Sequence, residues 1–365
     1  MIRHSEFKLP GNPAEEHFFA GSALPGLCFE EEAQNLLADY SRAVTAAGCS
    51  EASEILLRFH LSDVTNQAPL LHRLLAGRSV FVSVLGQPPA DGSRIALEAW
   101  HWSGCGKRMI SPGCEAVNFN GSDVFLFRTG DSALSGSFEQ TGREFEALKH
   151  FLAEHDSTVE ANTVRTWLYC RDVDNNYAGL VRARNEFFTR NGMTSGTHFI
   201  ASTGIEAQHE SPSRLVAMES LNWARLRPGQ QIYLKAEHML SPTALYGVSF
   251  ERGTRLLLRD RSHYYISGTA SIDSRGQVVH PGDVRRQTVR MIENIAALLE
   301  SSAGSLSDLR WATVYLRDPA DAEAVRRILE EHLPAELPYV ILRAPVCRPA
   351  WLVETECIAV NPEGL

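Results

Sequence analysis

The hydrophobic pattern of the chain alternates between a helical and a strand period. Ile292, Ile295, Ala296 and Leu299 recur at the spacing that puts apolar side chains on one face of a helix. The same spacing predicts helices over 30–47, 66–76, 139–155, 177–191, 283–301 and 320–332. Short β-branched and aromatic runs predict strands over 79–86, 94–101, 197–204, 213–221, 338–344 and 351–360, and further β structure within 222–272.

These elements repeat. Leu168-Tyr169-Cys170-Arg171-Asp172 reappears as Val314-Tyr315-Leu316-Arg317-Asp318, each after one predicted helix and before another. A fainter first copy contains Phe59-His60-Leu61-Ser62-Asp63, followed by Ile95-Ala96-Leu97-Glu98. Repeats of this length are domain-sized. We therefore expect three α+β units, at 1–110, 111–225 and 226–365, each with helices on one face of a sheet.

Three similar units in one chain are expected to pack as an internal pseudo-trimer, with sites at the interfaces between units. Such a chain already closes its own ring, so we expect it to be a monomer.

Composition narrows the range of possible functions and partners. Of 365 residues, 44% are hydrophobic and 22% are charged, which is ordinary for globular domains and excludes disorder. The net charge of -9 disfavours nucleic acid as a partner. The sequence has neither an apolar run long enough to span a membrane nor a signal peptide, so we expect a soluble, cytoplasmic protein.

Cofactor signatures are missing from the sequence. The seven cysteines form no Cys-x-x-Cys pair, and no zinc, P-loop or dinucleotide motif occurs. We therefore expect reduced thiols, no metal and no organic cofactor. Only four of the 35 basic residues are lysines, so arginine forks are the expected partners of any substrate carboxylate.

The last unit resembles a known superfamily. Pro242-Thr243, Tyr246-Gly247, the run Tyr265–Ala270 and the run Val353–Val360 are similar to the RidA/YjgF superfamily. The resemblance implies tandem chorismate-mutase-like units, which in that superfamily form trimers with sites between subunits. Its best-known members are imine and enamine hydrolases.

A narrower resemblance covers most of the chain. Val164–Tyr169, Arg182–Phe188, Ala201–Ile205, Ser267–Ser271 and Cys347–Glu354 are similar to the chorismatases. Those enzymes release pyruvate from the enolpyruvyl ether of chorismate, which makes chorismate the implied small-molecule substrate. A divergent N-terminal half ahead of a Rid-like domain is a further point of similarity.

Two alternatives stay open. One is a Rid-type imine or enamine hydrolase, which carries an arginine early in its penultimate strand. Alignment of Cys347-Arg348 with the end of that strand places Ile341 at this point, although a small gap brings Arg343 there instead. The other is a non-catalytic Rid relative that binds a metabolite.

Glu354 is the candidate acid. Glu354 and Glu356 are two apart in a predicted strand and share a face, and a carboxylate on a partly apolar face is paired, solvated or raised in pKa. The resemblance assigns the acid role to the first of them. The second unit has Ala217 at the aligned position and keeps Glu219, whereas Glu98 of the first unit leaves a second site open.

Cys347 is the second candidate in the chemistry. The resemblance gives this position to members that make 3-hydroxybenzoate; attack by water would instead give a dihydroxycyclohexadiene carboxylate. A nucleophilic thiol is not needed for either product, and a lone strand cysteine also fits a packing role.

Several residues are candidates for binding the substrate. Arg348 is the first choice for a carboxylate, and Arg182 and Arg184 point in different directions, so at most one of them faces a site, with Arg184 preferred. Tyr177 is placed to hydrogen-bond a ring hydroxyl. Two predicted turns are expected to line the pocket: Ser202, Thr203, Gly204, and Gly268, Thr269, Ala270.

Overall fold

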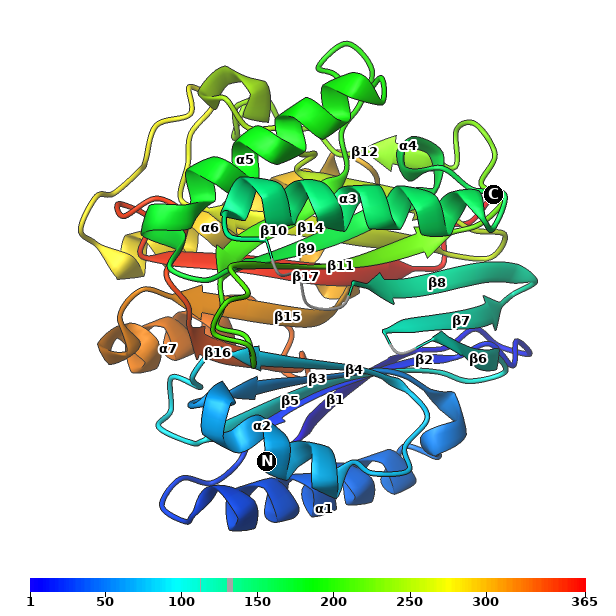
Figure 1. Cartoon of the computed structure of the whole chain (residues 1–365), viewed down its shortest axis with the longest axis vertical. Helices are drawn as coiled ribbons and strands as arrows, with labels where there is room; N and C mark the ends of the chain where they lie inside the picture. Colours follow the sequence, from blue (N-terminus) through cyan, green and yellow to red (C-terminus); the bar gives the residue numbers. More distant parts are fainter. Residues whose placement is uncertain (112, 130–133) are drawn as a thin grey trace.

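Three similar mixed sheets make up the protein. The computed structural model describes residues 1–111, 113–129 and 134–365. The sheets meet around a common centre, with the long helices on their outer sides (Figure 1). The chain is therefore α+β, with three units arranged as an internal pseudo-trimer. No helix within these described ranges has the length and apolar character needed to cross a membrane.

The first unit has a five-stranded sheet of order β1-β2-β5-β3-β4. Its elements are β1 (Arg3–Phe7), β2 (Glu16–Ser22), α1 (Phe29–Ala46), β3 (Glu54–Leu61), α2 (Val64–Leu74), β4 (Phe81–Gly86) and β5 (Ile95–Trp102).

The second unit has a six-stranded sheet of order β10-β9-β11-β8-β7-β6. Its elements are β6 (Gly106–Ser111), β7 (Cys114–Phe119), β8 (Ser122–Arg128), α3 (Ser137–Ala153), α4 (Val159–Asn162), β9 (Thr163–Cys170), α5 (Val173–Arg190), β10 (Ala201–Glu206) and β11 (Val216–Trp223).

The third unit has a six-stranded sheet of order β12-β13-β14-β17-β15-β16. Its elements are β12 (Gln231–Tyr233), β13 (Gly253–Leu257), β14 (Ser262–Ala270), α6 (Val284–Glu300), β15 (Leu309–Leu316), α7 (Ala322–His332), β16 (Tyr339–Arg343) and β17 (Val353–Asn361). The three sheets share one arrangement. The last strand of each unit (β5, β11 or β17) lies between the strands that open the unit and the strand that precedes its second long helix (β3, β9 or β15).

The predicted helices are confirmed to within a few residues. Ile292, Ile295 and Leu299 are buried on one face of α6, as their spacing predicts. That helix begins at Asp283, whose carboxylate accepts a hydrogen bond from the backbone N–H of Arg286.

The opening strands of the first two units were missed by the hydrophobic pattern. In β2, Glu16 and His17 are buried, which contradicts the simple alternation of apolar and polar residues. Glu16 accepts hydrogen bonds from Arg261 at 2.9 Å and His263 at 2.8 Å, both on or next to β14 of the third unit. Its buried charge is compensated only after the units meet.

A ring of polar contacts closes the centre. Strand register makes Arg58, Trp167 and Thr313 equivalent, since each lies opposite a glutamate in the last strand of its own unit. Each of the three donates to the equivalent glutamate of the next unit: Arg58 to Glu219 at 2.9 Å, Trp167 to Glu356 at 3.0 Å and Thr313 to Glu98 at 2.6 Å. Hydrogen bonds between buried polar groups of different units favour this one arrangement of the units.

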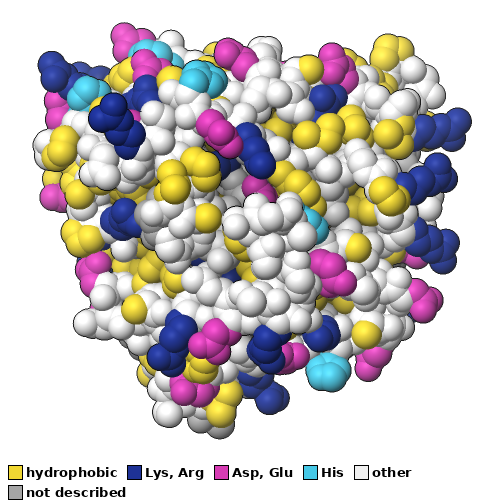
Figure 2. Space-filling model, turned by 90° about the horizontal axis from the view of Figure 1, so that it is seen from above, with side chains coloured by type: hydrophobic (Ala, Val, Ile, Leu, Met, Phe, Trp, Pro, Cys, Tyr) yellow, Lys and Arg dark blue, Asp and Glu magenta, His cyan; other side chains and the backbone are white. Residues whose placement is uncertain are grey.

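The surface is mixed in charge. Figure 2 shows basic and acidic side chains interspersed over the face seen from above, with hydrophobic side chains between them.

Candidate active site

A cavity lies between the second and third units. The second unit contributes α5 and β10, and the third contributes β14, β17 and the segment before β17. Ten of the eleven residues predicted for the site line this cavity: Tyr177, Arg184, Ser202, Thr203, Gly204, Gly268, Ala270, Cys347, Arg348 and Glu354. Residues from predicted elements about 170 positions apart in the sequence thus come together.

Glu354 is a buried carboxyl group at the wall of the cavity. Its residue is 5% exposed, and Gly268 on β14 leaves room for it, because a Cβ at that position would overlap the Glu354 carboxyl. Burial, helped by the nearby Glu356, raises the pKa of Glu354 to about 8, against the opposing effect of Arg165 and Arg252. At neutral pH the group is therefore an uncharged acid that has a proton to give.

We expect stability to depend on pH through Glu354. The pKa rises from 4.5 to about 8 on folding, so folding favours the protonated form. This contribution is fully present below pH 4.5 and is lost as the pH rises through about 8. Within that window the loss approaches ~1.4 kcal/mol per pH unit.

Denaturant unfolding of the wild type and of Glu354→Gln across this range measures the effect as a difference. The Gln variant has no proton to lose, so its free energy of unfolding should fall less with pH. Parallel curves for the two proteins would contradict the raised pKa.

Glu356 has a different environment from Glu354, although both side chains point to the same side of β17. It is fully buried at the centre of the molecule and pairs with Arg165. Its carboxylate also accepts hydrogen bonds from Trp167 and Tyr315, each at 3.0 Å, and from Thr203. These contacts occupy the carboxylate and leave it no free face toward a ligand.

Arg184 brings an unpaired positive charge to the cavity. It is 1% exposed, and its Nε and Nη2 have no hydrogen-bond partner among the described residues. Its guanidinium lies 5.9 Å from the ring of Phe250. Arg182 instead stacks on Phe138 at 4.0 Å, so the two arginines diverge as the helical spacing predicts. Buried donors without partners are costly, and a ligand carboxylate would satisfy them.

Two further arginines border the cavity. Arg348 lines it and lies 5.1 Å from the ring of Trp351. Arg252 is buried and donates from Nε and Nη2 to the carbonyl of Ser241, at 3.2 and 2.9 Å. The cavity therefore has positive charge on both units, as an anionic ligand requires.

Cys347 and Tyr177 both line the cavity, one from each side of the unit boundary. Burial and the neighbouring Glu354 raise the pKa of Cys347 to about 12, so it is a thiol at neutral pH. The Tyr177 ring lies against Gly204, where a Cβ would come within 2.9 Å of it. Glycine is thus required at this point for the tyrosine to reach the cavity.

The two predicted turns are wrong. Ser202, Thr203 and Gly204 lie inside β10, which starts later and runs further than expected. Gly268–Ala270 lie inside β14, where the pairing with β17 shifts register between Ile266 and Thr269. The small residues around Gly268, at this irregularity, are what looks like a turn in the sequence.

The same two segments differ in what they offer the cavity. The Thr203 hydroxyl is engaged with Glu356 and with the backbone N–H of Gly268, and the Ser202 hydroxyl accepts from Thr166 at 2.9 Å. Thr269, the eleventh predicted residue, is fully buried and donates to the carbonyl of Ser267. It is not among the lining residues.

The other two interfaces contain alanine where Glu354 stands. Glu354 pairs across from Tyr315, and the equivalent pairs are Ala217 with Tyr169 and Ala96 with His60. The expectation that Glu98 keeps a second site open is therefore corrected, because Glu98 is equivalent to Glu356. The sequence alignment of the first unit was displaced by two residues, which keeps the same strand face.

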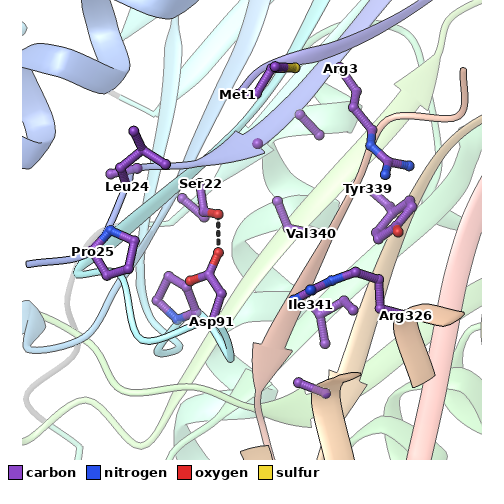
Figure 3. A pocket seen from close by; sticks show the side chains of 16 residues that line it. Met1, Arg3, Ser22, Leu24, Pro25, Asp91, Arg326, Tyr339, Val340 and Ile341 are labelled. Carbon is purple, nitrogen blue, oxygen red and sulfur yellow. Dashed lines mark hydrogen bonds between the residues drawn. The ribbon is translucent and has the colours of Figure 1, made fainter. Parts of the chain in front are cut away.

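A hollow at the interface of the first and third units shows the difference. Ala96 is one of its lining residues. Val340 and Ile341 of β16, with Arg3 and Tyr339, border the same hollow (Figure 3). Ile341 thus belongs to this hollow, and Arg343 is exposed. At the Glu354 cavity the penultimate strand is β10, whose lining residues include no arginine.

Sequence reasoning missed five residues of the Glu354 cavity. Four are apolar and one is Arg252; they are Val248, Phe250, Arg252, Ile272 and Trp351. Most lie in or next to the segment 222–272, for which the sequence predicted β structure without a register. A strand without register does not reveal which side chains face a site.

Comparison with known proteins agrees with this architecture. The sequence profile of the family described as Endoribonuclease L-PSP matches residues 257–361. The 3-aminoacrylate deaminase RutC of Acinetobacter baylyi is 33% identical over 96 residues, which are 26% of this chain and 76% of that protein. A crystal structure of a chorismatase covers 84% of this chain and 93% of its own, with a TM-score of 0.64 and 21% identity.

The protein is thus a three-unit α+β chain with a buried acid between its second and third units. It belongs to the RidA/YjgF superfamily. Its fold over most of its length is that of the chorismatase structure.

Proposed function

We propose that this chain cleaves the enolpyruvyl ether of chorismate and releases pyruvate in the cavity between its second and third units. One observation carries the proposal: a buried, protonated Glu354 and the unpaired guanidinium of Arg184 border the same cavity. Chorismate has what both groups need, namely an enol ether whose methylene carbon accepts a proton and two carboxylates that accept hydrogen bonds from arginine.

The proposed reaction starts with proton transfer from Glu354 to the methylene carbon. This converts the enol ether into an oxocarbenium ion, while Glu354 becomes a carboxylate. If water adds, its extra proton returns to Glu354, and the resulting hemiketal breaks its bond to the ring oxygen. The products are then pyruvate and a dihydroxycyclohexadiene carboxylate, and Glu354 is ready for another cycle.

The second route needs no water in the balance, since chorismate divides directly into pyruvate and 3-hydroxybenzoate. We assign the choice to Cys347, whose thiol lines the cavity together with Glu354 and Tyr177. A neutral thiol excludes water from that part of the wall without acting as a nucleophile. We therefore expect 3-hydroxybenzoate as the ring product.

The test is pyruvate release from chorismate, followed by coupling to lactate dehydrogenase, with chromatography of the ring product. Release above the spontaneous rate supports the proposal, and the chromatogram identifies the route. Release of pyruvate with only the diol would retain the reaction and remove the role of Cys347. No release above background would refute the chorismatase function.

A second candidate is hydrolysis of an imine or enamine on a small carboxylate. It is favoured by the similarity to 3-aminoacrylate deaminase RutC, which extends over 96 residues of this chain. Against it, the lining part of β10 supplies no arginine to grip a carboxylate. Ammonia released from an enamine generated in the assay, without pyruvate release from chorismate, would select this candidate.

We expect Arg184→Met to weaken substrate binding. The change keeps the apolar bulk of the side chain and removes the charge that would meet a carboxylate. Loss of charge-assisted hydrogen bonds worth about 1.5–3 kcal/mol raises KM by about 10- to 100-fold. The free energy of unfolding should hold or rise, because an unpaired buried charge disappears.

Arg190→Met is the matched control, since this arginine lies on the same helix but is exposed and pairs with Glu146 away from the cavity. Steady-state kinetics of both variants measure the difference. Equal values of KM for the two would remove Arg184 from the binding site.

A further inference from the structure

The β1–β2 hairpin brings together two histidines and a glutamate far from the Glu354 cavity. His4 and Glu6 are two apart on β1, and His17 on β2 pairs directly across from Glu6. Their side chains therefore share one face of the hairpin. One nitrogen or oxygen atom from each lies within 4.8 Å of the others.

The distances suit a tetrahedral metal ion. His4 Nε2 is 3.0 Å from His17 Nδ1, and Glu6 Oε2 is 3.6 Å from the same nitrogen. Zinc–nitrogen and zinc–oxygen bonds of about 2.0–2.2 Å put tetrahedral ligands roughly 3.3–3.5 Å apart. Two of the three separations are thus within a few tenths of an ångström of the value that a bound ion would impose, and the third is at most 4.8 Å.

The surroundings of His17 favour its role as a ligand. It is 1% exposed, and its other ring nitrogen, Nε2, lies 3.4 Å from Glu15 Oε2. A carboxylate in this place fixes the proton on Nε2 and leaves the lone pair of Nδ1 for a metal.

Lys8 is the group that a cation would have to displace. Its ammonium lies 3.1 Å from Glu6 and 3.4 Å from Glu15, where it balances their charge. The side chain is 40% exposed, so it is free to move into solvent when another cation takes its place. Because Lys8 and a metal ion would compete for Glu6, removal of the lysine should strengthen metal binding if the site is real.

We propose that His4, Glu6 and His17 form a binding site for a divalent transition-metal ion of the zinc class, with Glu15 as the carboxylate that orients His17. A ligand set of two imidazoles and one carboxylate suits ions of this class better than it suits hard cations. The site is separate from the proposed chemistry at Glu354.

A metal here would have a structural effect across a unit boundary. β1 is an edge strand, and its other face meets the third unit, where Ser5 donates to the carbonyl of Arg310 and Arg3 pairs with Glu330 at 3.0 Å. An ion that ties β1 to β2 therefore strengthens the closure of the ring formed by the three units.

The test uses the full chain without a histidine tag, stripped with chelator and titrated with Zn²⁺ by calorimetry and with Co²⁺ by visible absorption. We expect one Zn²⁺ per chain, and a Co²⁺ spectrum of the intense tetrahedral type. Lys8→Met should tighten binding about three- to tenfold, because it removes a competing charge. Glu15→Gln should weaken it about 10- to 100-fold.

His4→Ala and His17→Ala should abolish the stoichiometric binding, and His4, being partly exposed, is the variant less able to disturb folding. His72→Ala is the matched control, since His72 forms an exposed pair with Glu210 elsewhere. The absence of stoichiometric binding to the wild type, or equal loss in the His4 and His72 variants, would overturn the proposal. So would unchanged affinity in Lys8→Met.

Discussion

Replacement of Glu354 by Gln lowers the rate of pyruvate release from chorismate by about 10²- to 10⁴-fold, the usual contribution of a general acid. The amide has nearly the shape of the protonated carboxyl but no proton acidic enough to transfer to carbon. Because the folded protein already holds Glu354 as an uncharged acid at neutral pH, the variant should fold normally. The loss should therefore appear in kcat, with little change in KM.

The measurement is the coupled pyruvate assay with purified wild type and variant, at matched concentration of folded protein. A second readout is the pH profile of the wild type, which should lose activity as the pH rises through about 8, where Glu354 gives up its proton. Full activity of the Gln variant would exclude Glu354 as the acid and with it the proposed mechanism.

Replacement of Glu356 by Gln, two residues further along β17, should lower the free energy of unfolding, which replacement of Glu354 leaves largely unchanged at neutral pH. Here the native group is a carboxylate paired with Arg165 at the closed centre of the molecule, where both residues are at most 2% exposed. Removal of one charge leaves the Arg165 guanidinium buried without a counter-charge, which costs about 3–5 kcal/mol. The free energy of unfolding should fall by that amount, and the pH at which activity is lost should move down, because the charge of Glu356 helps to raise the pKa of Glu354.

Denaturant unfolding at pH 7 compares the two Gln variants directly. They carry the same chemical change at neighbouring positions of one strand face, so each serves as the control for the other. Similar stability of the two variants would show that the central ion pair does not hold the units together, and would contradict the division of roles between Glu354 and Glu356.

The local elements of the fold were predictable because they depend on nearby residues. Helical spacing such as that of Ile292 and Ile295, and the capping aspartate Asp283, fix where α6 forms and begins. The repeated strand ending in Arg-Asp shows that one unit occurs more than once. Together with the motif around Glu354, these local signals lead to the superfamily and to most of the cavity.

The limits of that prediction lie in strand register. The first unit was aligned two residues out, so that Glu98 stood in for Glu354, because a shift of two keeps every side chain on the same face and leaves the pattern unchanged. The structure removes the ambiguity through cross-strand pairs such as Arg58 with Glu98. The bulge in β14 was misread as a turn for a similar reason, since glycine suits both.

What the sequence by itself determined is therefore the repeated α+β unit, its helices and strands, and the acid that stands out in the last copy. Only the tertiary structure decided which arginine is buried in the same cavity as that acid, that Arg252 also lines this cavity, and that Glu356 pairs with Arg165. It also decided that Glu16 finds its partners some 245 residues away. The physical reason is that burial and compensation of charge arise where units close on one another, and no local pattern encodes those distances.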